Sequence, residues 1–248
     1  MLQEERYDKI LEILEEEEYV SVGKLSQTLF VSLPTVRRDL AELEKRELIL
    51  RSHGGAKKLQ SENTVVPFEF RRAVNAKEKK KLCEAALPLI SDNQIIFIDA
   101  SSSAMQLAYL LSSEQNLTVI TNSIILCTVL SKRGIKNYCT RGEFQQKSMC
   151  FAGEIAENTV SDFNFDIMFF SSHGVSDENV ITDTSYKETM LRRRVMRRSK
   201  KTVFLCDSSK FGESAPYNLA PLDKLDYIVT DKSDLMLSPE CHVKIILT

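Results

Sequence analysis

The sequence has no long hydrophobic run and no pattern typical of export. Its longest apolar stretches, such as residues 95–98 and 124–127, are far shorter than the roughly 20 residues that a membrane helix needs. The first twenty residues carry a run of acids instead of a basic region followed by an apolar one, so we expect no secretory signal. Because 43% of the 248 residues are hydrophobic, a proper core is expected. These features predict a folded cytoplasmic protein with no membrane partner.

Cysteine is present, but not in a pattern that binds metal or builds a disulfide framework. The six cysteines stand singly, with no C-x-x-C pair and no histidine at ligand spacing. They are Cys83, Cys127, Cys139, Cys150, Cys206 and Cys241. We therefore expect buried or reduced thiols, no metal site and no cofactor. The alternative is a redox sensor, for which Cys150 is the first residue to test.

Charge is almost balanced overall, at −2, but it is unevenly distributed. Residues 1–19 carry eight acids and two bases, a net charge of −6, whereas residues 20–58 carry eight bases and four acids, a net charge of +4. A basic patch confined to one short segment is typical of a face that contacts phosphates. The segment 20–58 is therefore a candidate nucleic-acid interface.

The spacing of apolar residues predicts three helices in this region. Residues 3–18 form an amphipathic pattern, Ser21 is a plausible N-cap for a short second helix, and residues 30–32 form a turn before a third helix. In the third helix four residues recur at helical intervals and are expected on one buried stripe. They are Leu33, Val36, Leu40 and Leu43. Residues 48–56 read as a strand and a glycine turn, the beginning of a wing.

This arrangement predicts a winged helix-turn-helix whose third helix lies in a major groove. Arg37 and Arg38 can reach base edges or phosphates, while Ser32 and Thr35 can bond to phosphate oxygens at the positive end of the helix. Helical periodicity alone leaves an ordinary helical hairpin with solvated charges equally open.

Residues 59–75 lose this periodicity and contain Pro67, as a linker would. The remainder, residues 76–248, alternates strands and helices. Strands are predicted at residues 94–99, 117–121, 135–140, 165–171, 202–206, 227–230 and 243–247. Helices are predicted at residues 77–90, 102–111, 123–131, 154–161 and 185–198. Near-continuous apolar strands between helices indicate an α/β domain with a mostly parallel sheet.

Two polar segments of this domain remain open to more than one interpretation. The loop of residues 99–103 could hold an anion at the start of the next helix, or it could supply only an N-cap serine. A basic run between Arg192 and Lys201 could be a solvated face or a subunit contact, or a second contact with DNA or an effector.

The run Ser-Leu-Pro-Thr-Val-Arg-Arg-Asp-Leu at residues 32–40 resembles the signature of the DeoR family of bacterial repressors. The first helix and the Arg-Ser-His-Gly-Gly-Ala wing at residues 51–56 also resemble that family, and the likeness extends to the Asp-Ser-Ser-Lys-Phe-Gly segment at residues 207–212. The resemblance implies that Arg37 and Arg38 belong to the recognition helix and that the wing residues Arg51 and His53 assist them. Asp39 would orient Arg38 or a wing base through a local ion pair.

The resemblance also implies a second domain with the fold of ribose-5-phosphate isomerase that senses a phosphorylated sugar. Lys210 would pair with the phosphate, Asp99 with a sugar hydroxyl, and Asn122 would help to close the pocket. The further positions matching the family's pocket are Ser101, Ser102, Ser103, Gly142 and Gly174.

The sequence therefore predicts a DNA-binding regulator with three parts: a winged helix-turn-helix over residues 1–58, a linker over 59–75 and an effector-sensing α/β domain over 76–248. Its expected partners are double-stranded operator DNA, a phosphorylated sugar and further copies of itself, as a dimer or tetramer. Repression is the mode that the family resemblance implies. The alternatives are an isomerase-like enzyme with a DNA-binding appendage, using Asp99 or Glu188 as base, and a repressor with a non-functional pocket controlled by oligomerisation.

Overall fold

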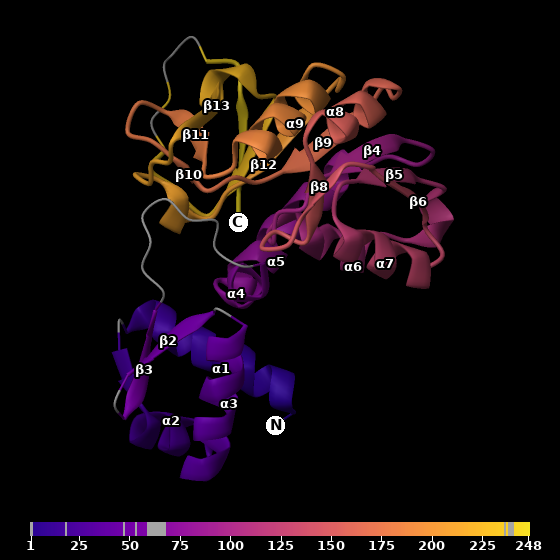
Figure 1. The fold of residues 1–248 in the computed structure, drawn as a ribbon. Coiled ribbons are helices and arrows are strands. Elements are labelled where there is room, and N and C mark those ends of the chain that lie inside the picture. The colour runs from indigo at the N-terminus through magenta and orange to yellow at the C-terminus, as the bar shows by residue number, and fades with distance from the viewer. Residues whose placement is uncertain are drawn as a thin grey trace. The chain divides into compact units, whose positions relative to one another are not determined.

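The computed structural model of the chain describes residues 2–17, 19–46, 48–52, 54–58, 68–235, 237 and 241–248. The chain divides into two compact units, Met1–Ala76 and Lys77–Thr248, and each has its own hydrophobic core. Both are drawn in Figure 1. Over the described ranges, no helix is long and apolar enough to cross a membrane.

The first unit combines short helices with a small antiparallel sheet. Its elements are α1 (Gln3–Glu16), β1 (Tyr19–Ser21), α2 (Val22–Leu29), α3 (Leu33–Lys45), β2 (Ile49–Ser52), β3 (Gly55–Lys58) and α4 (Phe68–Ala73). The strands pair in the order β1-β3-β2, so β2 and β3 form the predicted wing and β1 extends it. Ser21 caps α2 as expected, because its Oγ accepts a hydrogen bond from the Lys24 amide at 3.1 Å.

The core of the first unit is built from the apolar stripes of α1, α2 and α3. Val36, Leu40 and Leu43 of α3 are fully buried, as the periodicity predicts. Leu33 is not: its exposed fraction is 43%, because it is the first residue of α3 and lies at the edge of the core. The prediction that Leu33 belongs to the buried stripe is therefore wrong.

Part of the segment predicted as a linker is helical. Phe68–Ala73 forms α4, which packs against α1, and Phe70 and Ala73 are buried in the core of the first unit. Residues 59–67 lie outside the described residues. Two phenylalanines within three residues bury enough apolar surface to order this short segment, which its lack of periodicity did not reveal.

The second unit is built on a parallel sheet of seven strands. They are β4 (Ile95–Ile98), β5 (Thr118–Thr121), β6 (Lys136–Cys139), β9 (Ile167–Phe170), β12 (Thr202–Leu205), β14 (Tyr227–Thr230) and β15 (Lys244–Leu247). They pair in the order β15-β14-β12-β9-β4-β5-β6, and every pair is parallel. All seven correspond to the predicted strands, which confirms the expected α/β class.

Helices cover both faces of this sheet. In Figure 1, α6 (Leu107–Leu110) and α7 (Ile124–Lys132) lie on one face and α8 (Glu154–Ser161) and α9 (Tyr186–Met196) on the other. Before the first strand come α5 (Ala76–Ala86) and the 3-10 turn Leu87–Leu89. Further 3-10 turns lie at Ala104–Gln106, Ser113–Gln115, Ser208–Lys210 and Leu222–Lys224. Residues 102–111, predicted as one helix, thus hold a 3-10 turn and a single α-helical turn.

The sequence patterns gave no sign of five short strands. The hairpin of β7 (Glu143–Gln145) and β8 (Cys150–Ala152) follows β6. A three-stranded antiparallel sheet is formed by β10 (Gly174–Val175), β11 (Val180–Asp183) and β13 (Tyr217–Pro221), which packs on α9. β7, β8 and β10 have only two or three residues, and β11 and β13, although as long as the parallel strands, do not form near-continuous apolar runs between helices.

Candidate functional site

The exposed face of α3 is the first candidate site. Arg37 and Arg38 are exposed, and within the described part of the chain neither forms an ion pair, so their guanidinium groups face solvent. Ser32 is the exposed N-cap, and its Oγ accepts a hydrogen bond from the Thr35 amide at 3.4 Å and lies 2.9 Å from the Thr35 Oγ1. Ser32 and Thr35 thus stabilise the first turn of the helix that presents the arginines.

Asp39 has a different role from the one predicted. It is fully buried on the inner side of α3, and Arg6 of α1 binds it with two hydrogen bonds: Nε to Oδ2 at 2.7 Å and Nη2 to Oδ1 at 3.0 Å. The hydrogen bonding to Asp39 raises the pKa of Arg6. Asp39 therefore anchors α3 to α1 and does not orient Arg38 or a wing base.

The wing supplies a further cation. Arg51 of β2 lies 3.5 Å from Glu44 of α3, and its amide donates to the same carboxylate at 3.3 Å. This exposed contact ties the wing to the recognition helix. His53, the other wing residue predicted to contact DNA, lies outside the described residues.

The second candidate site lies at the carboxyl edge of the parallel sheet. Because the strands are parallel, the residues that follow them gather at one edge. Buried polar residues follow four neighbouring strands. They are Asp99 and Ser101–Ser103 after β4, Asn122 after β5, Thr140 after β6, and Ser171 after β9.

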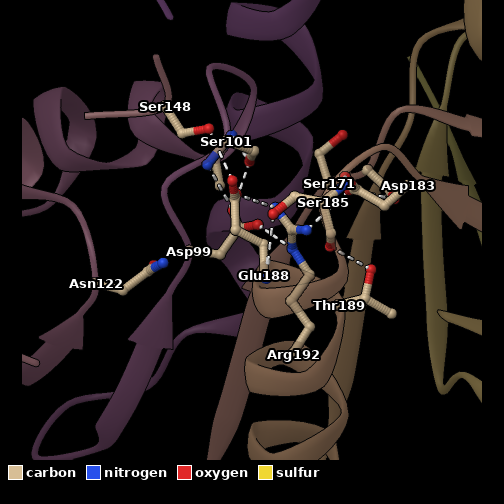
Figure 2. Close-up of polar contacts among 12 residues, drawn as sticks. Asp99, Ser101, Asn122, Ser148, Ser171, Asp183, Ser185, Glu188, Thr189 and Arg192 are labelled. Carbon is tan, nitrogen blue, oxygen red and sulfur yellow. Dashed lines mark hydrogen bonds and ion pairs between the residues drawn. The ribbon is translucent and has the colours of Figure 1, made fainter. Parts of the chain in front are cut away.

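One arginine cross-links this edge. Arg192, on α9, is buried and bonds to three carboxylates: Asp99 at 2.8 Å, Asp183 at 2.8 Å and Glu188 at 3.4 Å (Figure 2). Burial opposes its charge, but the three carboxylates outweigh that effect, so the pKa of Arg192 lies above its ordinary value. The guanidinium is therefore permanently charged and joins α9 to the loop after β4 and to the end of β11.

Asp99 and Glu188 both have further internal contacts. The Asp99 carboxylate accepts hydrogen bonds from the amide of Ser101 at 3.0 Å and from its hydroxyl at 2.5 Å, and Ser101 Oγ in turn accepts from the Ala104 amide. Glu188 accepts from Ser148 of the β7–β8 connection at 2.7 Å. Both carboxylates proposed as bases in the enzyme alternative are thus engaged by the protein itself.

Lys210 is joined to the same network through the end of β9. Its Nζ donates to Ser171 Oγ at 2.7 Å and to the Ser172 carbonyl at 2.8 Å, while the Ser172 hydroxyl bonds to Asp183 at 2.9 Å. The structure thus brings Lys210, Asp183, Arg192 and Asp99 together through a continuous series of contacts.

Three buried oxygens at this edge have no hydrogen-bond partner among the described residues. They are Ser103 Oγ, Asn122 Oδ1 and Thr140 Oγ1. Asn122 uses only its amide nitrogen, which donates to the Phe151 carbonyl at 3.2 Å. Because a buried polar group without a partner costs free energy, these oxygens are what a hydrogen-bonding ligand would satisfy.

The two glycines predicted for the pocket have visible packing roles. Gly142 has a φ of +132°, and a Cβ there would meet the Ala152 carbonyl at 2.8 Å. Gly174 lies in β10, where a Cβ would meet the backbone of Glu213 at 2.4 Å. Both positions require glycine because another chain segment approaches closely.

Sequence reasoning missed the structural use of the basic run. Arg192 is fully internal, Arg193 donates to the carbonyls of Leu219 and Asn218, and Arg198 donates to that of Phe163. These three make intrachain contacts, whereas Arg197, Lys200 and Lys201 of the same run are exposed. The i,i+4 spacing of Glu188 and Arg192 was the available signal.

Lys79 was also missed. It is buried on α5, one helical turn before Cys83, whose thiol donates to the Ser103 carbonyl at 3.1 Å. Residues four apart share a helix face, so this buried cation lies on the face of α5 that meets the loop of residues 101–103. Nothing in the sequence pattern distinguishes Lys79 from the exposed lysines beside it.

The fold and these two sites define a transcriptional regulator with a winged helix-turn-helix unit and a separate sensor unit. Residues 6–62 match the DeoR-like helix-turn-helix domain, and residues 74–232 match the DeoR C-terminal sensor domain. The chain belongs to the DeoR family of transcriptional regulators.

Relatives match over nearly the whole chain. The uncharacterized HTH-type transcriptional regulator YulB of Bacillus subtilis (strain 168) is 34% identical over 232 residues, which cover 93% of this chain and 90% of that protein. The glycerol-3-phosphate regulon repressor of Escherichia coli (strain K12) is 29% identical over 232 residues, covering 93% and 92%. Ribose 5-phosphate isomerase A of Methanocaldococcus jannaschii aligns with a TM-score of 0.41 and 16% identity over 55% of each chain.

Proposed function

We propose that this protein represses transcription by placing α3 in the major groove of an operator and that a phosphorylated sugar releases it. The observation that carries the DNA-binding half is the exposure of Arg37 and Arg38 on a helix anchored from behind by the Arg6–Asp39 pair. Exposed guanidinium groups on a rigidly held helix can bond to guanine edges or to phosphates. Further contacts to the phosphate backbone of the DNA would come from Ser32, Thr35, Arg51 and His53. The proposed site of action is the cytoplasm.

The test is a titration of fluorescent duplexes that tile the DNA flanking the gene, at two salt concentrations. Arg37→Ala should weaken specific binding by about 10- to 100-fold, which corresponds to the roughly 1–3 kcal/mol of one base-reading arginine. Lys9→Ala, at an exposed lysine of α1 that pairs with Glu12, is the matched loss of one positive charge and should change specific binding little. Equal binding by wild type and Arg37→Ala, or the absence of specific binding, would contradict the proposal.

The effector half is supported by the polar edge of the sheet. Ser103, Asn122 and Thr140 offer buried oxygens, while Lys210 and Lys79 supply positive charge for a phosphate. The name of the Escherichia coli relative, a glycerol-3-phosphate regulon repressor, agrees with a phosphorylated ligand. We therefore assign the effector site to Asp99, Ser101, Ser102, Ser103, Asn122, Gly142, Gly174 and Lys210.

To test this site, the stability of the protein to heat and to denaturant is measured with each sugar phosphate and, for comparison, with the corresponding unphosphorylated sugar. A ligand at a hundredfold excess over its Kd stabilises a native protein by about 2.7 kcal/mol. The phosphorylated member should stabilise the second unit and weaken DNA binding, and Lys210→Met should remove both effects. If no sugar phosphate stabilises the protein, its control rests on oligomerisation and the effector assignment fails.

The chain is proposed to bind DNA as a dimer or tetramer and to have no catalytic activity. Two copies can place two recognition helices in successive major grooves, so a two-fold symmetric operator is expected. Asp99 and Glu188 are both bound to Arg192, and neither is left as a base. Light scattering of the protein–operator complex and an isomerase assay on the purified protein are the corresponding measurements. A single copy on the operator or turnover of a sugar phosphate would overturn these points.

A further inference from the structure

The beginning of α3 exposes apolar side chains where a DNA-binding helix enters the groove. Leu33 and Pro34 are its first two residues, and both are exposed, Leu33 by 43%. The helix does not need them there for its own core, which is made by Val36, Leu40 and Leu43. In a helix-turn-helix protein, residues at the N-terminal end of the recognition helix are the ones that contact base edges.

These two residues come one helical turn before the two exposed arginines of α3. Leu33 lies four residues before Arg37, and Pro34 lies four residues before Arg38. Residues four apart in a helix are neighbours on the same face. Each exposed apolar side chain therefore lies beside an exposed guanidinium group.

The major groove offers a matching pattern of groups. Thymine is the base that presents a methyl group there, and apolar side chains contact it, whereas arginine bonds to the O6 and N7 of guanine. We propose that Leu33 and Pro34 read thymine methyl groups in the operator, next to bases or phosphates contacted by Arg37 and Arg38. This inference rests on the proposed DNA-binding function and names the base chemistry that would give it specificity.

The surroundings of the apolar pair favour DNA over a protein partner. Two side chains flanked by two arginines form an apolar area far below the roughly 1,200 Å² of a standard protein interface. The adjoining positive charge complements phosphate, and phosphate contacts supply most of the affinity for DNA. A thymine methyl is small enough to be covered by one leucine or proline side chain.

The decisive experiment removes the methyl group alone. Each thymine of a bound operator duplex is replaced in turn by uracil, and the affinities of wild type, Leu33→Ala and Pro34→Ala are measured by fluorescence anisotropy. At one or two positions uracil should weaken wild-type binding by about three- to fivefold, as expected for one buried methyl group. The corresponding variant should bind thymine and uracil duplexes equally at that position.

Leu2→Ala is the matched control, because Leu2 is an exposed leucine at the start of α1. It should retain the wild-type response to uracil, and circular dichroism should show unchanged helicity for all three variants. If uracil changes nothing at any position, or if both α3 variants keep the full response, the methyl-reading proposal is overturned while specific binding stands. Absence of specific binding to any duplex would overturn the proposed function and this inference together.

Discussion

The two units of this protein use buried charge in opposite ways. In the first unit, one largely buried arginine meets one carboxylate: Arg6 binds Asp39, and the two arginines just before Asp39 on α3 are left exposed. In the second unit, Arg192 meets three carboxylates in the interior. Its neighbour Arg193 bonds to main-chain carbonyls of the same unit.

The difference shows that a cluster of arginines in a sequence does not by itself mark a binding surface. A balanced internal pair fixes the position of α3 while leaving its outer cations available to a polyanion such as DNA. An internal cation among surplus carboxylates instead connects elements of its own unit, because Arg192 joins α9 to the loop after β4 and to the end of β11. Four variants or measurements test this comparison.

Breaking the Arg192 centre should have the largest effect. Arg192→Met leaves Asp99, Asp183 and Glu188 buried without their counter-charge, which should cost the second unit about 3–5 kcal/mol. Urea unfolding followed by amide exchange in β4 and β9 measures this loss.

Arg197→Met is the control for that variant. Arg197 is the exposed C-cap of the same helix, and its loss should change stability by less than about 0.5 kcal/mol. If Arg192→Met cost no more than this control, the three carboxylates would not depend on Arg192.

Breaking the pair in the first unit should cost less. Arg6→Met leaves Asp39 charged and buried, but the Arg6 side chain reaches the surface and water can enter, so we expect about 2–3 kcal/mol. Amide exchange in α1 and α3 reports this change. Lys9→Met, which removes an exposed pair with Glu12 on the same helix, should cost about 0–1 kcal/mol. Equal losses in the two variants would show that Asp39 does not anchor α3.

Removing a main-chain contact of the basic run should have a smaller effect still. The guanidinium group of Arg193 serves two carbonyls, those of Leu219 and Asn218, and a lysine presents a single ammonium group in its place. Arg193→Lys should therefore destabilise the contact between α9 and β13 by about 1 kcal/mol, even though the charge is kept. Faster amide exchange in β13 but not in β4 is the expected result. Unchanged exchange in β13 would mean that Arg193 is not a structural residue.

The smallest effect is expected from thiol reagents. Burial raises the pKa of Cys83, of Cys206 and, to about 12, of Cys139. Cys150, the first residue proposed for a redox sensor, is fully buried. In the native protein at pH 8 these four thiols should alkylate far more slowly than after unfolding, because little thiolate is accessible. Rapid native alkylation of Cys150, with a change in DNA binding, would support the redox alternative.

Sequence patterns predicted the repeating parts of this fold well. All seven strands of the parallel sheet and the three helices of the first unit were found, because apolar runs and 3.6-residue periodicity persist over their lengths. The helix α4, the strand β1 and the five short strands of the second unit were missed, since none of them is a near-continuous apolar run or a stretch long enough to show helical periodicity. The exposed Arg37 and Arg38 were predicted correctly from the same helical spacing that buries Val36 and Leu40.

The partners of charged residues could not be predicted in this way. Asp39 was expected to pair with Arg38 or with a base of the wing, but its partner Arg6 lies 33 positions away. Asp99 and Arg192 are 93 positions apart and meet only because α9 begins at the edge of the sheet where β4 ends. Leu33 satisfied the buried spacing, yet the end of a helix has no neighbour to cover it.

The sequence by itself determined the two domains, their classes and the membership of the DeoR family, because these depend on local periodicity and on a contiguous motif. Only the tertiary structure decided which cations face solvent and which are internal. That choice depends on pairings between residues far apart in the chain, where burial makes an unpaired charge costly and so selects its partner.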